Sequence, residues 1–188
     1  KPSKIKNEDF VIGTIKSIEN YNGIDCLIDA VNIIIHDYRI NLSVSIVGDG
    51  SLRNSMEQRA KDLNIFEHVK FHGHVDHNYI KSFYDELSVF IAVSTRESFG
   101  VSVLEAAACQ IPSITSNIGG LIEVNKDNVT GKVINANDPN QLADSIVNLM
   151  MNVDLRNKMG KAARKRVSEK FNFAENSKQM ISIYKKFK

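Results

Sequence analysis

Short apolar runs alternate along this chain with longer stretches whose apolar residues recur at helical spacing. Val89 to Val93 is apolar throughout and bounded by polar residues, which is typical of a strand buried on both faces. Ile24 to Ile35 instead spaces its apolar residues as one side of a helix does. Parallel strands need such crossover helices, so the alternation predicts an α/β fold: a Rossmann-like, three-layer, doubly wound parallel sheet with helices on both faces. Strands are expected at 10–15, 42–47, 69–72, 89–93, 111–115 and 131–134, the last at a sheet edge.

Length and composition are consistent with one soluble globular domain over residues 1–188. The formal net charge of +2 is too small to indicate a nucleic-acid partner. No stretch approaches the roughly 18 consecutive apolar residues of a membrane span, and we expect a cytoplasmic protein. Cys26 and Cys109 fall on apolar helix faces, where free buried thiols are expected. Because the chain begins at Lys1, we expect a piece of a longer protein.

The stretch from Ser94 to Glu123 contains the residues best suited to bind a ligand. It follows the strand expected at 89–93, and Ser98 is a common helix cap, so we expect a helix from about Phe99 or Gly100. A helix N-terminus at the carboxyl end of a parallel strand is an anion site because its first amides lack partners. Gly100 has no side chain, which would let a ligand approach the backbone closely.

Two carboxylates lie near the start of this expected helix. Glu97 is in the turn, and Glu105 is almost two turns into the helix, with its Cα–Cβ bond tilted toward the N-terminus. Carboxylates repel a phosphate, but they accept hydrogen bonds from neighbouring hydroxyl groups. A ligand that offers both a diphosphate and sugar hydroxyls therefore fits this pattern.

The motif E-S-F-G-V-S-V-L-E-A, which begins at Glu97, resembles the signature of the retaining glycosyltransferases of family 4. The accompanying short motifs are Ile111-Pro112, Gly119-Gly120 and Glu123. The resemblance implies the C-terminal lobe of a GT-B enzyme, which binds a nucleotide-diphosphate sugar while the acceptor enters from an N-terminal lobe. It implies a hexosyltransferase of polysaccharide biosynthesis that acts on a glycan or lipid-linked acceptor with retention of configuration. We expect this lobe alone to be inactive, and its last helix, from about 170 to 188, to cross to the other lobe.

The resemblance also implies roles for individual residues. Glu97 would act at the catalytic centre by orienting the donor sugar, and Glu105 would accept hydrogen bonds from the ribose. The backbone of His74 and Val75 would line the base pocket. The amides that would serve phosphate and sugar hydroxyls belong to Phe99, Gly100 and Val101. No Asp-x-Asp motif is present where a metal-bound diphosphate would need one, so no metal or other cofactor is expected.

Family 4 enzymes usually hold the diphosphate with an Arg and a Lys in the loop after the first strand. Alignment on Gly23 places Ser17 and Asn22 at those positions, so the usual cationic pair is missing. Lys16, one residue away, and Arg96, beside the motif, are the candidates to replace it. The alternative is a solvent-exposed Lys16 with no role in binding.

Three interpretations of function stay open. The chain is the donor half of a glycosyltransferase, a non-catalytic nucleotide-binding or interaction module, or an NAD-type oxidoreductase domain. The first is the interpretation that we favour, and the missing cations motivate the second. The third depends on Gly48-x-Gly50-x-x-Arg53 after a strand, but Arg53 replaces the third glycine of a dinucleotide fingerprint and no suitable acid follows. A tight turn explains this motif better.

Two other clusters have simpler explanations than the functions they suggest. Residues that suit zinc or iron by type are His72, His74, Asp76 and His77. A strand end and a helix cap explain them better. Basic residues on the helix expected at 155–170 suggest peripheral contact with an anionic membrane, at its inner face. A solvated helix face is the interpretation that we favour.

Overall fold

The structure is a computed structural model and describes residues 10–187. Within that range six strands form one parallel sheet in the order β3-β2-β1-β4-β5-β6. The strands are β1 (Val11–Ile15), β2 (Ser43–Val47), β3 (Val69–Gly73), β4 (Val89–Ala92), β5 (Ser113–Ser116) and β6 (Gly131–Ile134). Each lies at an expected position, and β6 is at an edge. The expected doubly wound parallel α/β fold is therefore confirmed.

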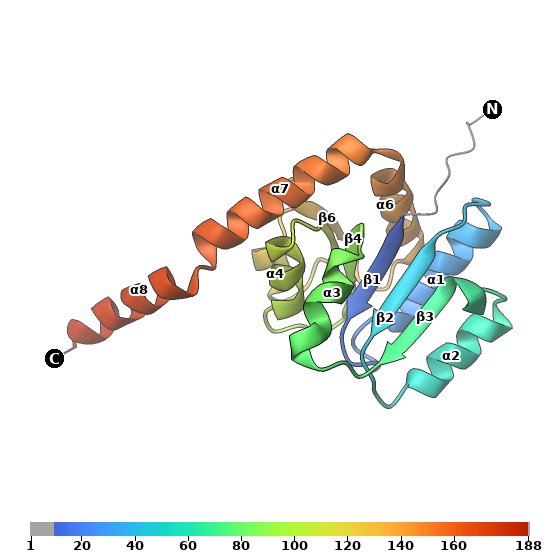
Figure 1. Cartoon of the computed structure of the whole chain (residues 1–188), viewed down its shortest axis with the longest axis horizontal. Helices are drawn as coiled ribbons and strands as arrows, with labels where there is room; N and C mark the ends of the chain where they lie inside the picture. The colour runs from blue at the N-terminus through green and yellow to red at the C-terminus, as the bar shows by residue number, and fades with distance from the viewer. Residues whose placement is uncertain (1–9, 188) are drawn as a thin grey trace.

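Helices cover both faces of the sheet and complete the three layers (Figure 1). Those on the first face are α1 (Ile24–His36), α2 (Arg53–Asp62) and α6 (Pro139–Met151), and those on the second are α3 (Ile80–Asp85), α4 (Val101–Ala108) and α5 (Leu121–Val124). Neighbouring residues of a strand point to opposite faces. In β4, Val89 and Ile91 therefore join the first core, whereas Phe90 and Ala92 join the second.

Short helical turns and caps place these elements as the sequence patterns indicate. The 3-10 helices η1 (Phe66–His68) and η2 (His77–Tyr79) precede β3 and α3. The Asp76 carboxylate accepts from the Asn78 amide at 2.9 Å, so Asp76 caps η2. Both cysteines are free, and burial raises the pKa of Cys26 to about 12. Cys26 is therefore a core residue of low reactivity.

The chain ends in two long helices, α7 (Val153–Lys170) and α8 (Phe173–Lys185). α7 packs closely on the end of α4, because a Cβ on Gly160 would lie 2.0 Å from the carbonyl oxygen of Gln110. α8 then extends away from the sheet (Figure 1). Large apolar side chains that are exposed in and just after α8 are Met180, Ile181, Ile183, Tyr184 and Phe187. None of the helices between residues 10 and 187 combines the length and apolarity needed to cross a membrane.

Candidate functional site

The strand order reverses between β1 and β4, so the loops after these strands diverge at the carboxyl edge of the sheet. Residues 16–23 follow β1, and residues 93–100 follow β4. The two loops touch, since the Thr95 amide donates to the carbonyl of Tyr21 at 2.8 Å. In open α/β sheets, ligands bind in the crevice at such a reversal.

An ion pair between Lys16 and Glu97 joins the two loops. The Lys16 ammonium also donates to Ser94 Oγ at 2.7 Å. The side chains of Lys16 and Glu97 are only 12% and 16% exposed, so the alternative of a solvent-exposed Lys16 is wrong. The sequence did not indicate this pair, because its members come from separate loops.

The ion pair keeps Glu97 ionised. Burial acts to raise the pKa of Glu97, but the hydrogen bond and charge of Lys16 act against it, with help from the amides of Phe99 and Gly100. The pKa therefore lies below its usual value. Glu97 presents a fixed negative charge and free lone pairs to any ligand in the crevice.

The helix after β4 begins later than expected, and the prediction that Ser98 caps it is wrong. α4 starts at Val101, its N-cap is Gly100 without a side-chain hydrogen bond, and Ser98 is exposed. In the turn before the helix, the Phe99 amide donates to Glu97 Oε1 at 3.4 Å. The amides of Phe99 and Gly100 thus face the Glu97 carboxylate, and Val101 opens the helix with 60% of its surface exposed.

The role of Gly100 differs from the one expected. Its φ of 94° lies in the left-handed region that side chains disfavour, and a Cβ there would lie 3.0 Å from Leu121 Cδ2 and 3.3 Å from Val124 Cγ2. The space beside Gly100 is therefore occupied by α5. A neighbouring glycine, Gly120, lets α5 approach the other side of the turn, because its Cβ would lie 2.4 Å from Phe99 Cα.

Glu105 is fixed by a residue that the sequence did not single out as part of the site. The hydroxyl of Tyr84 in α3 donates to Glu105 Oε2 at 2.8 Å and lies 3.2 Å from the carbonyl oxygen of Ser102. Tyr84 is 2% exposed, and burial, followed by the hydrogen bond to Glu105, raises its pKa. Tyr84 therefore remains a hydroxyl donor at neutral pH and leaves the other oxygen of Glu105 for a ligand.

The positions of the usual cationic pair hold a neutral hydrogen-bonded pair. Asn22 Nδ2 donates to both the carbonyl oxygen and the hydroxyl of Ser17, each at 2.9 Å, and Asn22 is buried. Arg96 is exposed beside Glu97 in the sequence. Of the two candidate cations, Lys16 is therefore the one that the fold holds between the two loops, in contact with Glu97 and Ser94.

The turn after β2 borders the same edge of the sheet. A Cβ on Gly48 would lie 1.9 Å from the carbonyl oxygen of Lys16, and one on Gly50 would lie 2.5 Å from that of Ile18. These glycines permit packing against the β1–α1 loop, which supports the tight turn over the dinucleotide fingerprint. The Gly48 amide donates to the carbonyl of Gly73 at 2.8 Å, which brings the turn close to His74 and Val75. His74 is exposed and Val75 is half-buried.

Of the histidines at the end of β3, His72 has structural partners. His72 Nε2 lies 3.0 Å from Ser45 Oγ, and its ring meets the ring of Phe83 edge-on at 4.8 Å. Burial lowers the pKa of His72, which favours its neutral form. In the part of the chain that the structure describes, no group of three or more His, Cys, Asp and Glu side chains is placed to hold a metal ion.

Comparison with known proteins gives one family. A family model described as glycosyl transferases group 1 matches residues 1–166. The capsular polysaccharide biosynthesis glycosyltransferase CapM of Staphylococcus aureus is 31% identical over 188 residues, which are 100% of this chain and 49% of CapM. The chain spans about half the length of the relatives it matches.

Solved structures show the same fold. Anabaena HepE in complex with UDP has a TM-score of 0.87 at 21% identity, over 95% of this chain and 49% of HepE. The C-terminal domain of LpcC, a glycosyl transferase group 1 family protein of Francisella tularensis, has a TM-score of 0.80 at 22% identity, over 92% of this chain and 95% of that domain. At these identities the likeness concerns the fold alone.

Proposed function

Because the chain belongs to the glycosyl transferases group 1 family, we propose that it is the donor-binding lobe of a retaining glycosyltransferase. Its reaction moves a hexose-type sugar from a nucleotide diphosphate to a glycan or lipid-linked acceptor. The observation that carries this proposal is the Lys16–Glu97 ion pair, which lies at the point where the sheet reverses its strand order. A largely enclosed charge pair at the point of strand reversal is suited to a ligand that carries both phosphates and hydroxyls.

Lys16 would hold the diphosphate. An ammonium has three donors, of which Glu97 and Ser94 account for two, so the third is suited to a phosphate oxygen. When the bond between the sugar and the diphosphate breaks, negative charge builds up on the leaving phosphate, and the ammonium stabilises it. Exposed Arg96 would add a second cation when a ligand is bound.

The two glutamates would hold the hydroxyl groups of the donor. Glu97 is ionised and accepts hydrogen bonds, so it would orient the sugar with its reactive carbon toward the acceptor. Glu105, held by Tyr84, would accept from the ribose. The amide of Val101 would contribute at the helix start, and the backbone at His74 and Val75 would border the base. We assign no protein nucleophile: Glu97 is proposed to orient the sugar, and retention requires only that the new bond to the acceptor oxygen ends on the face that the diphosphate leaves.

The donor base is proposed from the fold neighbours. HepE and the Staphylococcus aureus protein TarM have both been solved in complex with UDP. We therefore propose a UDP-sugar as the first donor to test.

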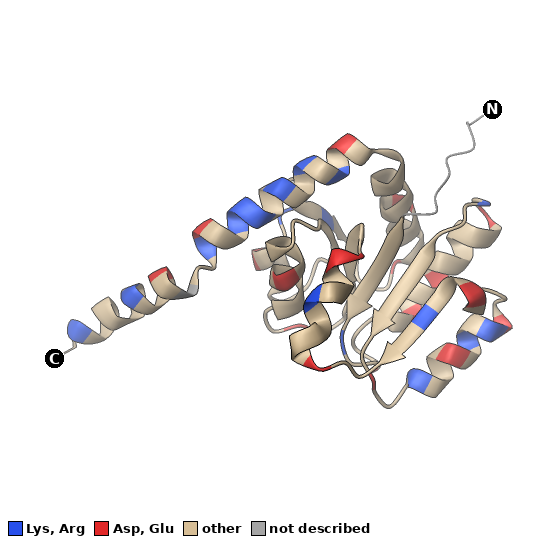
Figure 2. Ribbon diagram, in the orientation of Figure 1, with Lys and Arg blue, Asp and Glu red and all other residues tan. Residues whose placement is uncertain are grey.

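The proposed partner is an N-terminal acceptor lobe, which would cover the exposed apolar side chains of α8. Without that lobe, we expect the chain to transfer no sugar. Figure 2 shows Lys and Arg along α7, but Arg156, Arg164 and Arg166 donate to backbone carbonyls of other helices. These three arginines thus serve the fold, which weakens the argument from basic charge for a membrane surface. Contact with a membrane at its cytoplasmic side stays a secondary proposal.

A specific observation also favours the non-catalytic alternative. The neutral Ser17–Asn22 pair replaces the cations that family 4 enzymes usually present to the diphosphate. A module with this loop would retain the fold and lose phosphate affinity. The two proposals therefore differ in whether the chain binds a nucleoside diphosphate.

Titration calorimetry with UDP, GDP and NAD tests these proposals. The glycosyltransferase lobe should bind one of the diphosphates, and Glu105→Ala should weaken that binding at least about tenfold, because a carboxylate that accepts from a hydroxyl contributes about 1.5–3 kcal/mol. Glu67→Ala, at an 84% exposed side chain far from the crevice, is the matched control. No binding of either diphosphate would support the non-catalytic module, and binding of NAD alone would support the oxidoreductase domain.

A further inference from the structure

Two residues at the end of α7, Arg166 and Phe171, contact the surroundings of the turn that contains Glu97. Arg166, in the last turns of α7, donates through Nη2 to the carbonyl of Glu123 at 2.5 Å and through Nε to that of Val124 at 3.3 Å. These carbonyls end α5, where a helix has acceptors without partners of its own. Leu121 and Val124 of α5 pack beside Gly100. By holding the end of α5, Arg166 therefore also holds the helix on which the Glu97 turn packs.

Phe171 makes the second contact. It follows α7 directly, and its ring meets the ring of Phe99 at 5.9 Å between centroids and 66° between planes, an edge-to-face arrangement. The guanidinium of Arg166 lies over the Phe171 ring at 5.7 Å. Phe99 is the residue whose amide donates to Glu97 Oε1. A movement of Phe99 would therefore move a donor that helps to set the orientation of Glu97 and the low pKa of its carboxyl group.

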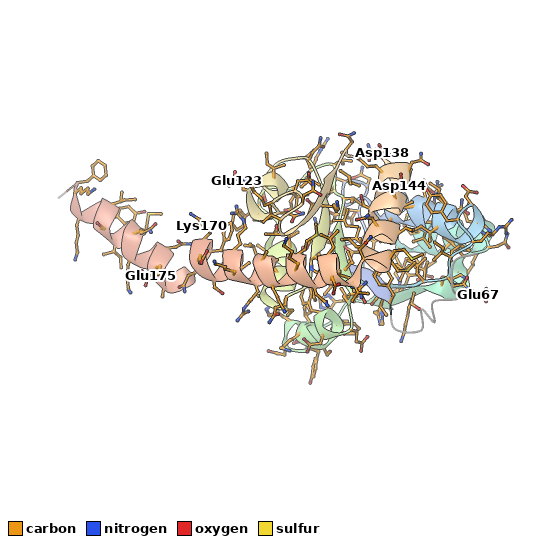
Figure 3. The ribbon with its side chains drawn as sticks, turned by 90° about the horizontal axis from the view of Figure 1, so that it is seen from above. Glu67, Glu123, Asp138, Asp144, Lys170 and Glu175 are labelled. Atoms are coloured by element: carbon orange, nitrogen blue, oxygen red, sulfur yellow. The ribbon has the colours of Figure 1, made fainter. Side chains whose placement is uncertain are left out.

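The contact lies where the chain leaves the body of the protein. Asn172 caps α8 through its Oδ1, which accepts from the amides of Ala174 at 3.0 Å and Glu175 at 3.3 Å. Figure 3 shows α8 lying clear of the sheet beyond Lys170 and Glu175. Whatever holds α8 also constrains Phe171, because only Asn172 separates them.

We propose that Phe171 is a positioning residue for the donor site, and that through it the placement of α8 sets donor affinity. This inference rests on the proposed function and deepens it. Phe171 holds Phe99 by its ring, and Phe99 holds Glu97 by its amide. When α8 is fixed on a partner, Phe171 is fixed with it, and the Glu97 turn loses less freedom on binding the donor. Donor affinity is then linked to the docking of α8.

The test measures UDP affinity by calorimetry for the chain and for Phe171→Ala and Phe171→Tyr. An edge-to-face aromatic pair contributes enough that its loss should weaken UDP binding about three- to tenfold in Phe171→Ala. Phe171→Tyr keeps the ring and should bind within about twofold of the unchanged chain. Phe66→Ala is the control: Phe66 is 40% exposed, more than partly buried Phe171, but like it contacts another aromatic ring, that of Phe71, and has a cation, the Lys61 ammonium, over its ring. It lies far along the sheet from the Glu97 turn.

A merely structural role for Phe171 would lower the melting temperature of Phe171→Ala and Phe66→Ala alike and leave UDP affinity unchanged in both. That result overturns the proposal. Phe171→Leu, which keeps apolar volume but loses the ring, gives the same test if Phe171→Ala fails to fold. If the unchanged chain binds UDP and the Phe171 variants match it, only the positioning role fails. If the unchanged chain binds neither UDP nor GDP, the proposed function fails and takes the positioning role with it.

Discussion

Two strand-to-helix turns at the same edge of the sheet carry similar sequence signals but differ in structure. The turn after β2 combines glycines with Asp49 and Arg53, and the turn after β4 combines a glycine with Glu97, which pairs with Lys16. The Arg53 and Asp49 side chains are 31% and 52% exposed, whereas those of Lys16 and Glu97 are 12% and 16% exposed. Charge in the first turn is solvated, and charge in the second is enclosed.

The difference teaches where to look for a ligand site. An exposed ion pair between residues four positions apart stabilises a turn weakly and needs no further explanation. An enclosed pair costs desolvation free energy, which must be offset by geometry that nearby residues maintain. Three contacts maintain the geometry of the Lys16–Glu97 pair: Ser94 accepts from Lys16, the Phe99 amide donates to Glu97, and α5 packs on the turn. The predictions below test whether the enclosed turn, and not the exposed one, is the functional site.

The largest expected effect separates the two turns by the role of their glycines. A Cβ on Gly48 would meet the backbone of Lys16 at 1.9 Å, and its φ of 136° suits glycine alone. Gly48→Ala should therefore lower the free energy of unfolding by about 3–5 kcal/mol. Gly100→Ala meets only side-chain ends, at 3.0 Å or more, and should lower it by about 1–2 kcal/mol through φ strain.

Urea denaturation of both variants measures these losses. If Gly100→Ala were as destabilising as Gly48→Ala, the side chains of α5 beside Gly100 would be as unable to move as the Lys16 backbone beside Gly48. The inference that α5 meets Gly100 only through side-chain ends, which can adjust, would then be wrong. Gly13→Ala serves as a reference for a glycine inside the sheet, since its Cβ would lie 2.5 Å from the carbonyl oxygen of Ser45.

The next effect concerns the ion pairs themselves. Lys16→Met removes the cation and leaves Glu97 enclosed without a partner, so we expect a loss of about 2–3 kcal/mol in unfolding free energy, below the full cost for a completely buried pair. UDP affinity should fall about 100-fold, because Lys16 would be the main contact with the diphosphate. Arg53→Met, the control in the exposed turn, should change stability by less than about 1 kcal/mol and leave UDP affinity unchanged.

The same comparison shows what a sequence can predict. All six strands were expected because each depends on a local apolar run, such as 89–93, that only a buried strand accommodates. The start of α4 was misplaced because the type of Ser98 suggested a cap, whereas the helix begins after Gly100, which is in the left-handed conformation and has no side-chain cap. Propensity describes one residue, but this cap depends on the conformation of its neighbours.

Contacts between distant segments were beyond local reasoning. The motif identified Glu97 and Glu105 as a pair, but their partners Lys16 and Tyr84 come from other elements. Lys16 was only one of two candidate cations, and Tyr84 was not singled out as part of the site. Phe171 gave no signal, since nothing near it in the sequence indicates that Phe99 is its neighbour. A fold is needed before such pairs can be named, because chain topology decides them.

The smallest expected effect is on the pH dependence of stability: the contribution of Glu97 should change with pH in opposite directions in the unchanged chain and in Lys16→Met. The pKa of Glu97 is depressed in the folded chain, so its contribution to stability is present above the unfolded pKa, about 4.3, and is lost as pH falls through the folded pKa. In Lys16→Met the cation is gone and burial dominates, so the folded pKa should rise above the unfolded value. Stability should then be gained below the unfolded pKa and lost as pH rises through the folded one.

Urea denaturation from pH 3 to pH 7, with Glu97→Gln subtracted as the baseline, isolates this term, which should be on the order of 1 kcal/mol in each direction. Asp49 is the counterpart in the exposed turn: its pKa is lowered first by the Gly50 amide, and Arg53 contributes less. Arg53→Met should therefore leave the direction of its pH dependence unchanged. The slope to compare is that of unfolding free energy against pH. Opposite slopes for Lys16→Met and the unchanged chain, with the same direction for Arg53→Met and the unchanged chain, would establish that enclosure distinguishes the two turns. Parallel slopes in all three proteins would mean that the amides of Phe99 and Gly100 keep the pKa of Glu97 low even without Lys16, and the contrast between the turns would then not depend on the ion pair.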